Sequence, residues 1–149
     1  MQEPVPEMVL ESSLYVSELE RAKEFYGRVL GLRVMKGFEG GRGVAMQVGP
    51  TVLLLFKAEE TLKGGPLLVH GTRGPGHVAF RVSEEEMPKW RVRLRECGVA
   101  IEKEITFGEN PPSIYFRDPD GNLLELAVRG IWPFDKTKWP ATSHEDDRR

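Results

Sequence analysis

The sequence has few residues that bind soft metals or cross-link a chain. One cysteine, Cys97, and three histidines, His70, His77 and His144, stand among 149 residues. A single thiol excludes an internal disulfide framework and every zinc site that needs several thiolates. Any metal site in this chain must therefore depend on carboxylates.

Long apolar runs and an excess of positive charge are also missing. No stretch approaches the roughly 20 apolar residues of a membrane span, and residues 1–10 lack the pattern of a secretory signal. The formal net charge is −2, which gives no support for nucleic-acid binding. We expect a cytoplasmic protein whose partner is a small molecule, with neither nucleic acid nor membrane bound.

The chain repeats one order of patterns in its two halves. Each half begins with a short alternating run, continues with apolar residues at helical spacing, and ends with three more alternating or apolar runs. Ser17 and Ser83 stand where helix N-caps are expected, and Gly31 and Gly98 follow the two helices. The predicted strands are 9–16, 33–38, 43–48 and 51–58 in the first half, and 77–82, 100–106, 112–118 and 122–128 in the second.

The two halves superpose as related modules. Glu11 falls on His77 and Val16 on Val82, both at an offset of 66 (77 minus 11, 82 minus 16), while Leu54 falls opposite Glu125. We therefore predict an α+β fold in which two βαβββ modules, in pseudo-twofold arrangement, form a curved mixed sheet around a cleft.

The predicted organisation is a single domain over residues 8–130, followed by an arm. Module 1 covers about 8–58, a Gly- and Pro-rich linker 59–75, and module 2 about 76–130. We expect His70, within that linker, to be solvated. The C-terminal arm, 131–149, ends in a charged tail, and its Trp132, Phe134 and Trp139 predict packing on its own domain or on a partner subunit.

Three residues that can bind metal fall on the strand faces turned away from the helices. Because side chains alternate along a strand, Glu11, His77 and Glu125 lie opposite the apolar, helix-facing rows. Glu125 interrupts an otherwise apolar strand, where an unpaired carboxylate would be costly. A site with one His and two carboxylates would hold a divalent cation and leave positions open for two adjacent substrate oxygens.

The segments ESSLYVSELERAKEFYGRVLGL, GPGHVAFRV and SIYFRDPDGNLLELAV together resemble the vicinal oxygen chelate superfamily of glyoxalases, bleomycin resistance proteins and dioxygenases. The resemblance implies paired modules around a U-shaped cleft and a homodimer. It also implies a divalent metal (Mn, Ni, Zn, Mg or Fe) held by Glu11, His77 and Glu125. Leu54 occupies the fourth ligand position and cannot bind metal.

Further site residues follow from the cleft-facing strand positions and the resemblance. Glu125 is the candidate catalytic base as well as a ligand. Val52, Leu54 and Phe56 place apolar side chains on the cleft face, which predicts a partly apolar pocket wall. The predicted substrate-binding residues are Tyr15, Leu54, Phe56, Arg81, Tyr115 and Arg117.

Three functions remain open on the sequence. The first is a metal-dependent isomerase, lyase or transferase of the glyoxalase type, acting on a small metabolite with adjacent oxygens. The second is a protein of the bleomycin-resistance type, which sequesters a small molecule without chemistry. The third, less favoured, is an extradiol dioxygenase, because Glu11 replaces a histidine that those enzymes use and the chain is short.

Overall fold

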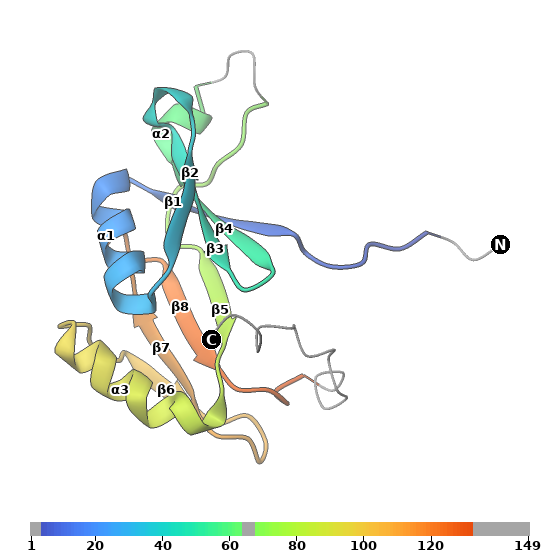
Figure 1. Cartoon of the computed structure of the whole chain (residues 1–149), viewed down its shortest axis with the longest axis vertical. Helices are drawn as coiled ribbons and strands as arrows, with labels where there is room; N and C mark the ends of the chain where they lie inside the picture. The colour runs from blue at the N-terminus through green and yellow to red at the C-terminus, as the bar shows by residue number, and fades with distance from the viewer. Residues whose placement is uncertain (1–3, 64–67, 133–149) are drawn as a thin grey trace, which may run out of the picture. The chain divides into compact units, whose positions relative to one another are not determined.

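The computed structural model describes residues 4–63 and 68–132 and confirms the α+β fold with two βαβββ modules (Figure 1). Each module contains one four-stranded mixed sheet and one principal helix. The first contains β1 (Glu11–Val16), α1 (Leu19–Leu30), β2 (Arg33–Gly37), η1 (Glu39–Gly41), β3 (Gly43–Val48), β4 (Thr51–Lys57) and α2 (Ala58–Thr61). The second contains β5 (His77–Arg81), η2 (Glu84–Glu86), α3 (Met87–Glu96), β6 (Lys103–Ile105), β7 (Ser113–Arg117) and β8 (Leu123–Ala127).

The chain divides into two compact units that do not coincide with the two modules. Among the described residues, the first unit holds 4–63, 68–77 and 117–123, and the second holds 78–116 and 124–132. The turn between β7 and β8 thus belongs to the unit of the first module. We describe each unit by itself.

The first sheet has the strand order β1-β4-β3-β2, with β1 parallel to β4 and the remaining pairs antiparallel. One face packs against α1 (Figure 1), since the buried helix residues Phe25 and Val29 and the strand residues Leu14 and Leu55 form apolar rows. Gly31 ends α1 in the left-handed region, at φ 71°, a conformation that glycine adopts without steric cost.

The second sheet has the order β5-β8-β7-β6. Its core contains Leu94 of α3, Ile114 and Phe116 of β7, and Leu124 of β8, all fully buried. Pro88 lies in the first turn of α3, where its missing N–H costs nothing. Arg91 of α3 binds Glu104 of β6 through two hydrogen bonds of 2.8 and 3.1 Å.

The N-cap expectations hold only in part. Ser83 is the N-cap residue of η2, although its side chain makes no capping hydrogen bond, whereas the N-cap of α1 is Glu18 and not Ser17. The Ser17 hydroxyl donates instead to Asp120 Oδ1 at 2.6 Å, because a partner far along the sequence offers a charged acceptor. The predicted linker also begins with a helical turn, α2.

The turn DPDGN is held to the first sheet and α1 by a buried carboxylate. Asp118 accepts four hydrogen bonds, from the Tyr26 hydroxyl at 2.8 Å, the Asn122 side-chain amide at 2.8 Å, and the backbone N–H groups of Asp120 and Asn122 at 2.9 Å each. Asn122 also donates to the Tyr15 carbonyl and accepts from the Gly76 N–H. The motif therefore fixes the approach to β5 and the start of β8.

We expect Tyr26→Phe to lower the free energy of unfolding by about 2 kcal/mol, because it removes a buried hydrogen bond to a charged acceptor. Burial, together with the Asp118 carboxylate, raises the pKa of Tyr26 well above its usual 10.0. The Tyr26–Asp118 hydrogen bond therefore makes its full contribution to the free energy of unfolding below pH 10, where the tyrosine of the unfolded chain keeps its proton. It is lost as the pH rises further, by about 1.4 kcal/mol per pH unit.

Urea unfolding of both proteins between pH 7 and 11 measures this difference. The gap between wild type and Tyr26→Phe should shrink above pH 10, while Ser17→Ala, at an exposed hydrogen bond, should cost less than about 1 kcal/mol. A gap that stays constant up to pH 11 would contradict the assignment.

In the described part of the chain no helix is long and apolar enough to cross a membrane.

The predicted C-terminal arm is described only at its start. Trp132 is exposed, at 61% of its surface, while Phe134, Trp139 and the charged tail of the predicted arm lie outside the described residues.

Candidate functional site

The face of the first sheet opposite α1 carries three cross-strand rows. Glu11 pairs with Val52, Ser13 with Leu54, and Tyr15 with Phe56 in the parallel β1–β4 ladder. Leu54 and Phe56 are 7% exposed, whereas Glu11 is exposed. Both faces of β4 are therefore buried, as predicted, and the carboxylate of Glu11 lies at the open end of the face.

Aromatic rings cover the Phe56 end of this face. The ring of Phe56 lies 5.4 Å from that of Phe38, 6.3 Å from that of Tyr15 and 4.8 Å from the imidazole of His70, centroid to centroid. The rings of Phe56, Phe38 and Tyr15 form an apolar cluster with Ala45, Leu54 and Val52. The structure thus places the predicted substrate residues Tyr15, Leu54 and Phe56 side by side.

His70 is half-buried and hydrogen-bonded, contrary to the expectation of a solvated side chain in a glycine-rich linker. Its backbone N–H donates to the Thr61 carbonyl at 3.2 Å, which fixes the segment after the undescribed residues 64–67 against the end of α2. Its Nδ1 lies 2.7 Å from the Tyr15 hydroxyl, and its Nε2 lies 3.4 Å from Arg42 Nη2. His70 and Arg42 therefore belong to the site, and sequence reasoning missed both.

His77 begins β5 and is exposed. Its Nδ1 lies 3.0 Å from the Leu123 carbonyl oxygen. Because a carbonyl can only accept, Nδ1 carries the proton and donates, and Nε2 is the nitrogen suited to a metal. A backbone carbonyl that orients a ligand imidazole in this way is typical of metal sites.

Matching hydrogen bonds support the alignment of the two modules. The Val52 N–H donates to the Leu10 carbonyl in the first sheet, at 3.1 Å, and the Leu123 N–H donates to the Gly76 carbonyl before the second, at 2.8 Å. Leu10 and Gly76 differ by 66, and Val52 and Leu123 by 71, so the equivalent of Leu54 is residue 125 (54 plus 71). Leucine stands in one module where the other has Glu125.

Glu125 lies in β8 and is 5% exposed, between the fully buried Leu124 and Leu126. The hydroxyl of Tyr115, on the neighbouring strand β7, forms a side-chain hydrogen bond with its carboxylate. Burial, and after it the hydrogen bond and charge of Glu125, raise the pKa of Tyr115 to about 12. A carboxylate buried in an apolar strand is costly unless it is paired, and the role of Glu125 as metal ligand or base stays a prediction.

The two predicted arginines are exposed. Arg81 ends β5, and Arg117 ends β7, where its Nη1 donates to the Gly121 carbonyl at 3.0 Å. Arg117 therefore supports the DPDG turn, and a role for either arginine in substrate binding stays a prediction.

A metal-ligand cluster is not formed within residues 4–63 and 68–132, where no group of three or more His, Cys, Asp or Glu is arranged to hold an ion. Glu11 and His77 belong to the first unit and Glu125 to the second. The ligand set therefore stays a prediction, although the donor atoms fit. Donation from Nδ1 to the Leu123 carbonyl makes Nε2 the His77 nitrogen suited to a metal, and two carboxylates would balance a divalent charge.

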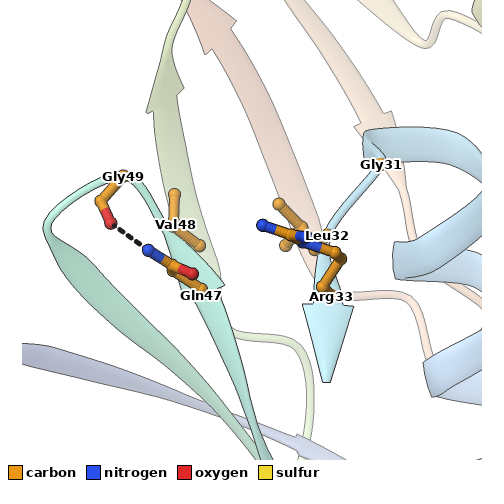
Figure 2. Close-up of a pocket in the computed structure, with 6 residues that line it drawn as sticks. All are labelled: Gly31, Leu32, Arg33, Gln47, Val48 and Gly49. Carbon is orange, nitrogen blue, oxygen red and sulfur yellow. Dashed lines mark hydrogen bonds between the residues drawn. The ribbon is translucent and has the colours of Figure 1, made fainter. Parts of the chain in front are cut away.

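A separate pocket of about 310 Å³ lies in the first unit, at the start of β2 and the end of β3 (Figure 2). It is lined by Gly31, Leu32, Arg33, Gln47, Val48 and Gly49. The Gln47 amide donates to the Gly49 carbonyl at 3.2 Å, as Figure 2 shows. None of the predicted site residues lines this pocket, and it does not contain the chemistry described above.

Comparison with known proteins identifies the family. The sequence profile described as the Glyoxalase/Bleomycin resistance protein/Dioxygenase superfamily matches residues 8–126. The chain belongs to this superfamily. This confirms the resemblance of the three segments and the module pattern.

Relatives within the superfamily include a glutathione transferase, FosA, of Serratia marcescens, which is 32% identical over 119 residues, 80% of this chain and 79% of the relative. A metallothiol transferase, FosB, of Bacillus licheniformis is 36% identical over 64 residues, only 42% of this chain and 40% of the relative. Among solved structures, a lactoylglutathione lyase of Agrobacterium tumefaciens is 30% identical, with a TM-score of 0.81 over 87% of this chain and 98% of that one.

Proposed function

We propose that this chain is a metal-dependent enzyme of the vicinal oxygen chelate type, which acts on a small metabolite with adjacent oxygens. The observation that carries the proposal is Glu125, a carboxylate buried in an apolar strand of a chain that belongs to this superfamily. A buried carboxylate needs a compensating charge, and a divalent cation supplies one.

The ligands in this proposal are His77 through Nε2, Glu125 and Glu11. One His and two carboxylates leave the bound cation close to neutral and coordinatively open, which suits Mn, Ni, Zn, Mg or Fe. The bound ion would act as a Lewis acid toward two adjacent substrate oxygens. Glu125 would also serve as the base that takes a proton from the substrate, and Tyr115 would hold its carboxylate in place.

The names of the relatives suggest a class of substrate. A glutathione transferase, a metallothiol transferase and a lactoylglutathione lyase share a small thiol, or an adduct of one, as reactant. We therefore propose that a low-molecular-weight thiol takes part in the reaction, as a transferase or lyase substrate. The aromatic face around Phe56 would accommodate the apolar part of the second reactant.

Assembly and location follow the family. We propose that the chain acts as a homodimer in the cytoplasm, with no nucleic acid or membrane partner.

Purified chain, stripped with a chelator and reloaded with Mn, Ni, Zn, Mg or Fe, tests the function. We expect one ion per chain by elemental analysis. Turnover should depend on that ion, either in S-lactoylglutathione formation or in thiol consumption with small oxygen-rich electrophiles. His77→Ala should lose both metal and turnover.

If the wild-type chain retained none of the five ions, the proposal of a metal-dependent enzyme would be contradicted. If small molecules nevertheless bound, that result would favour a sequestering protein of the bleomycin-resistance type.

A further inference from the structure

Arg42, His70 and Tyr15 form a hydrogen-bonded chain with a defined direction. A guanidinium can only donate, so in the 3.4 Å contact Arg42 Nη2 donates to His70 Nε2. The imidazole proton then lies on Nδ1, which donates to the Tyr15 hydroxyl oxygen at 2.7 Å. The chain therefore ends on a tyrosine whose own proton points to a further acceptor.

Nothing in the described residues supplies that acceptor. Within the described residues the Tyr15 hydroxyl has no hydrogen-bond partner besides His70, and no carboxylate forms an ion pair with Arg42. Burial raises the pKa of Tyr15, so the hydroxyl keeps its proton at neutral pH. A half-buried hydroxyl polarised by an uncompensated positive charge is a strong donor to a negatively charged oxygen.

The surroundings hold these groups in place. The guanidinium carbon of Arg42 lies 5.8 Å from the centroid of Phe56, a cation–π distance. The Arg42 carbonyl accepts from the Lys57 N–H at 2.8 Å, which ties its backbone to the end of β4. The Nε atom of Arg42 is buried without a hydrogen-bond partner in the described chain, and a positive charge so placed favours an anion nearby.

We propose that the Tyr15 hydroxyl binds an anionic oxygen of the substrate, a carboxylate or a phosphoryl-type group, with Arg42 and His70 as positioning residues. The apolar body of the same molecule would lie on the rings of Phe56 and Phe38. That the bound anion is the substrate rests on the proposed function. Its geometry belongs to the first unit alone, and none of the predicted metal ligands takes part in it.

Titration of the metal-free full chain with acetate, inorganic phosphate and methylphosphonate tests the inference. Nitrogen-15 NMR of the imidazoles should show His70 protonated on Nδ1, and the Tyr15 and His70 signals should shift on binding. Tyr15→Phe, which keeps the ring contact with Phe56, should weaken binding about tenfold, and Arg42→Ala by about as much. Arg42→Lys should recover part of the loss.

The controls separate this inference from the metal site. Arg28→Ala removes an exposed arginine of α1 that pairs with Glu24 and should bind the anions as wild type does. Tyr15→Phe and Arg42→Ala should still bind metal at one ion per chain, because neither residue is a predicted ligand. Absence of metal binding in the wild type would contradict only the proposed function. If acetate alone binds, the group is a carboxylate; if phosphate and methylphosphonate bind, it is phosphoryl-type. Absence of any anion binding to the wild type, or equal binding to Tyr15→Phe, would overturn the inference.

Discussion

Replacing Glu125 with glutamine is expected to abolish tight metal binding while the chain remains folded. Glutamine has the same shape and keeps a carbonyl oxygen that can accept from Tyr115, but it brings no negative charge. Loss of an outer-shell partner alone typically costs about 10–100-fold in metal affinity, so loss of a ligand should raise the dissociation constant by roughly 100-fold or more. Manganese titration followed by paramagnetic resonance measures this directly.

A second variant at the same position separates function from stability. The first module has Leu54 where the second has Glu125, so Glu125→Leu makes the two modules alike at this point. Replacing a buried charge with an apolar residue of similar volume is often neutral or stabilising. We expect the metal-free variant to unfold within about 1 kcal/mol of wild type, because the lost partner of Tyr115 offsets part of the gain.

The matched control is Glu104→Gln, in the same unit, which removes a carboxylate that pairs with Arg91 near the surface. It should bind metal normally and cost less than about 1 kcal/mol. Unchanged manganese affinity in Glu125→Gln would show that this carboxylate is structural. A large loss of stability in metal-free Glu125→Leu would point the same way.

Much of the fold could be predicted because its signals are local. Alternation along strands, helical spacing and the glycines after the helices gave both βαβββ modules, and the repeat placed Leu54 opposite Glu125. Glu125 could be selected as a candidate because a carboxylate between apolar neighbours in a predicted strand is costly when unpaired, and its role stays a prediction. Its burial in β8 agrees with that reasoning.

The parts that could not be predicted depend on contacts between distant residues. The pattern predicts Ser17 as the N-cap of the first helix, but Glu18 takes that position and the Ser17 hydroxyl donates to Asp120, 103 residues away. His70 was expected in solvent because glycine and proline surround it, and nothing local indicates that it reaches Tyr15, 55 residues earlier. Arg42 lies in a segment that reads as a turn. One signal was available: a tyrosine on the same face as Phe56 needs a hydrogen-bond partner when it is partly buried.

Gly43, at the start of β3, has no room for an added methyl group. It pairs with Phe56 across the β3–β4 ladder and is buried. A Cβ atom there would lie 2.8 Å from the Leu55 carbonyl oxygen and 2.9 Å from Cε1 of the Phe56 ring, closer than side chains pack. Glycine in a strand interior commonly marks such a close approach.

We expect Gly43→Ala to lower the free energy of unfolding by about 3 kcal/mol, at the upper end of the cost of overpacking. The Phe56 ring must turn away from the new methyl group. The contact with the Leu55 carbonyl oxygen remains, because a backbone oxygen cannot move alone. Because Phe56 contacts Tyr15, Phe38 and His70, the shift should also weaken anion binding at Tyr15. Chemical denaturation and the anion titration measure the two effects.

Gly37→Ala is the matched control, since a Cβ there has no atom within 4 Å and the backbone is in an ordinary conformation. It should change stability by no more than about 0.5 kcal/mol. The double variant Gly43→Ala, Phe56→Leu should recover part of the stability lost by Gly43→Ala, because the smaller side chain leaves room for the methyl group. Additive costs would instead show that the strain lies in the Leu55 backbone and that the position of Phe56 does not depend on Gly43.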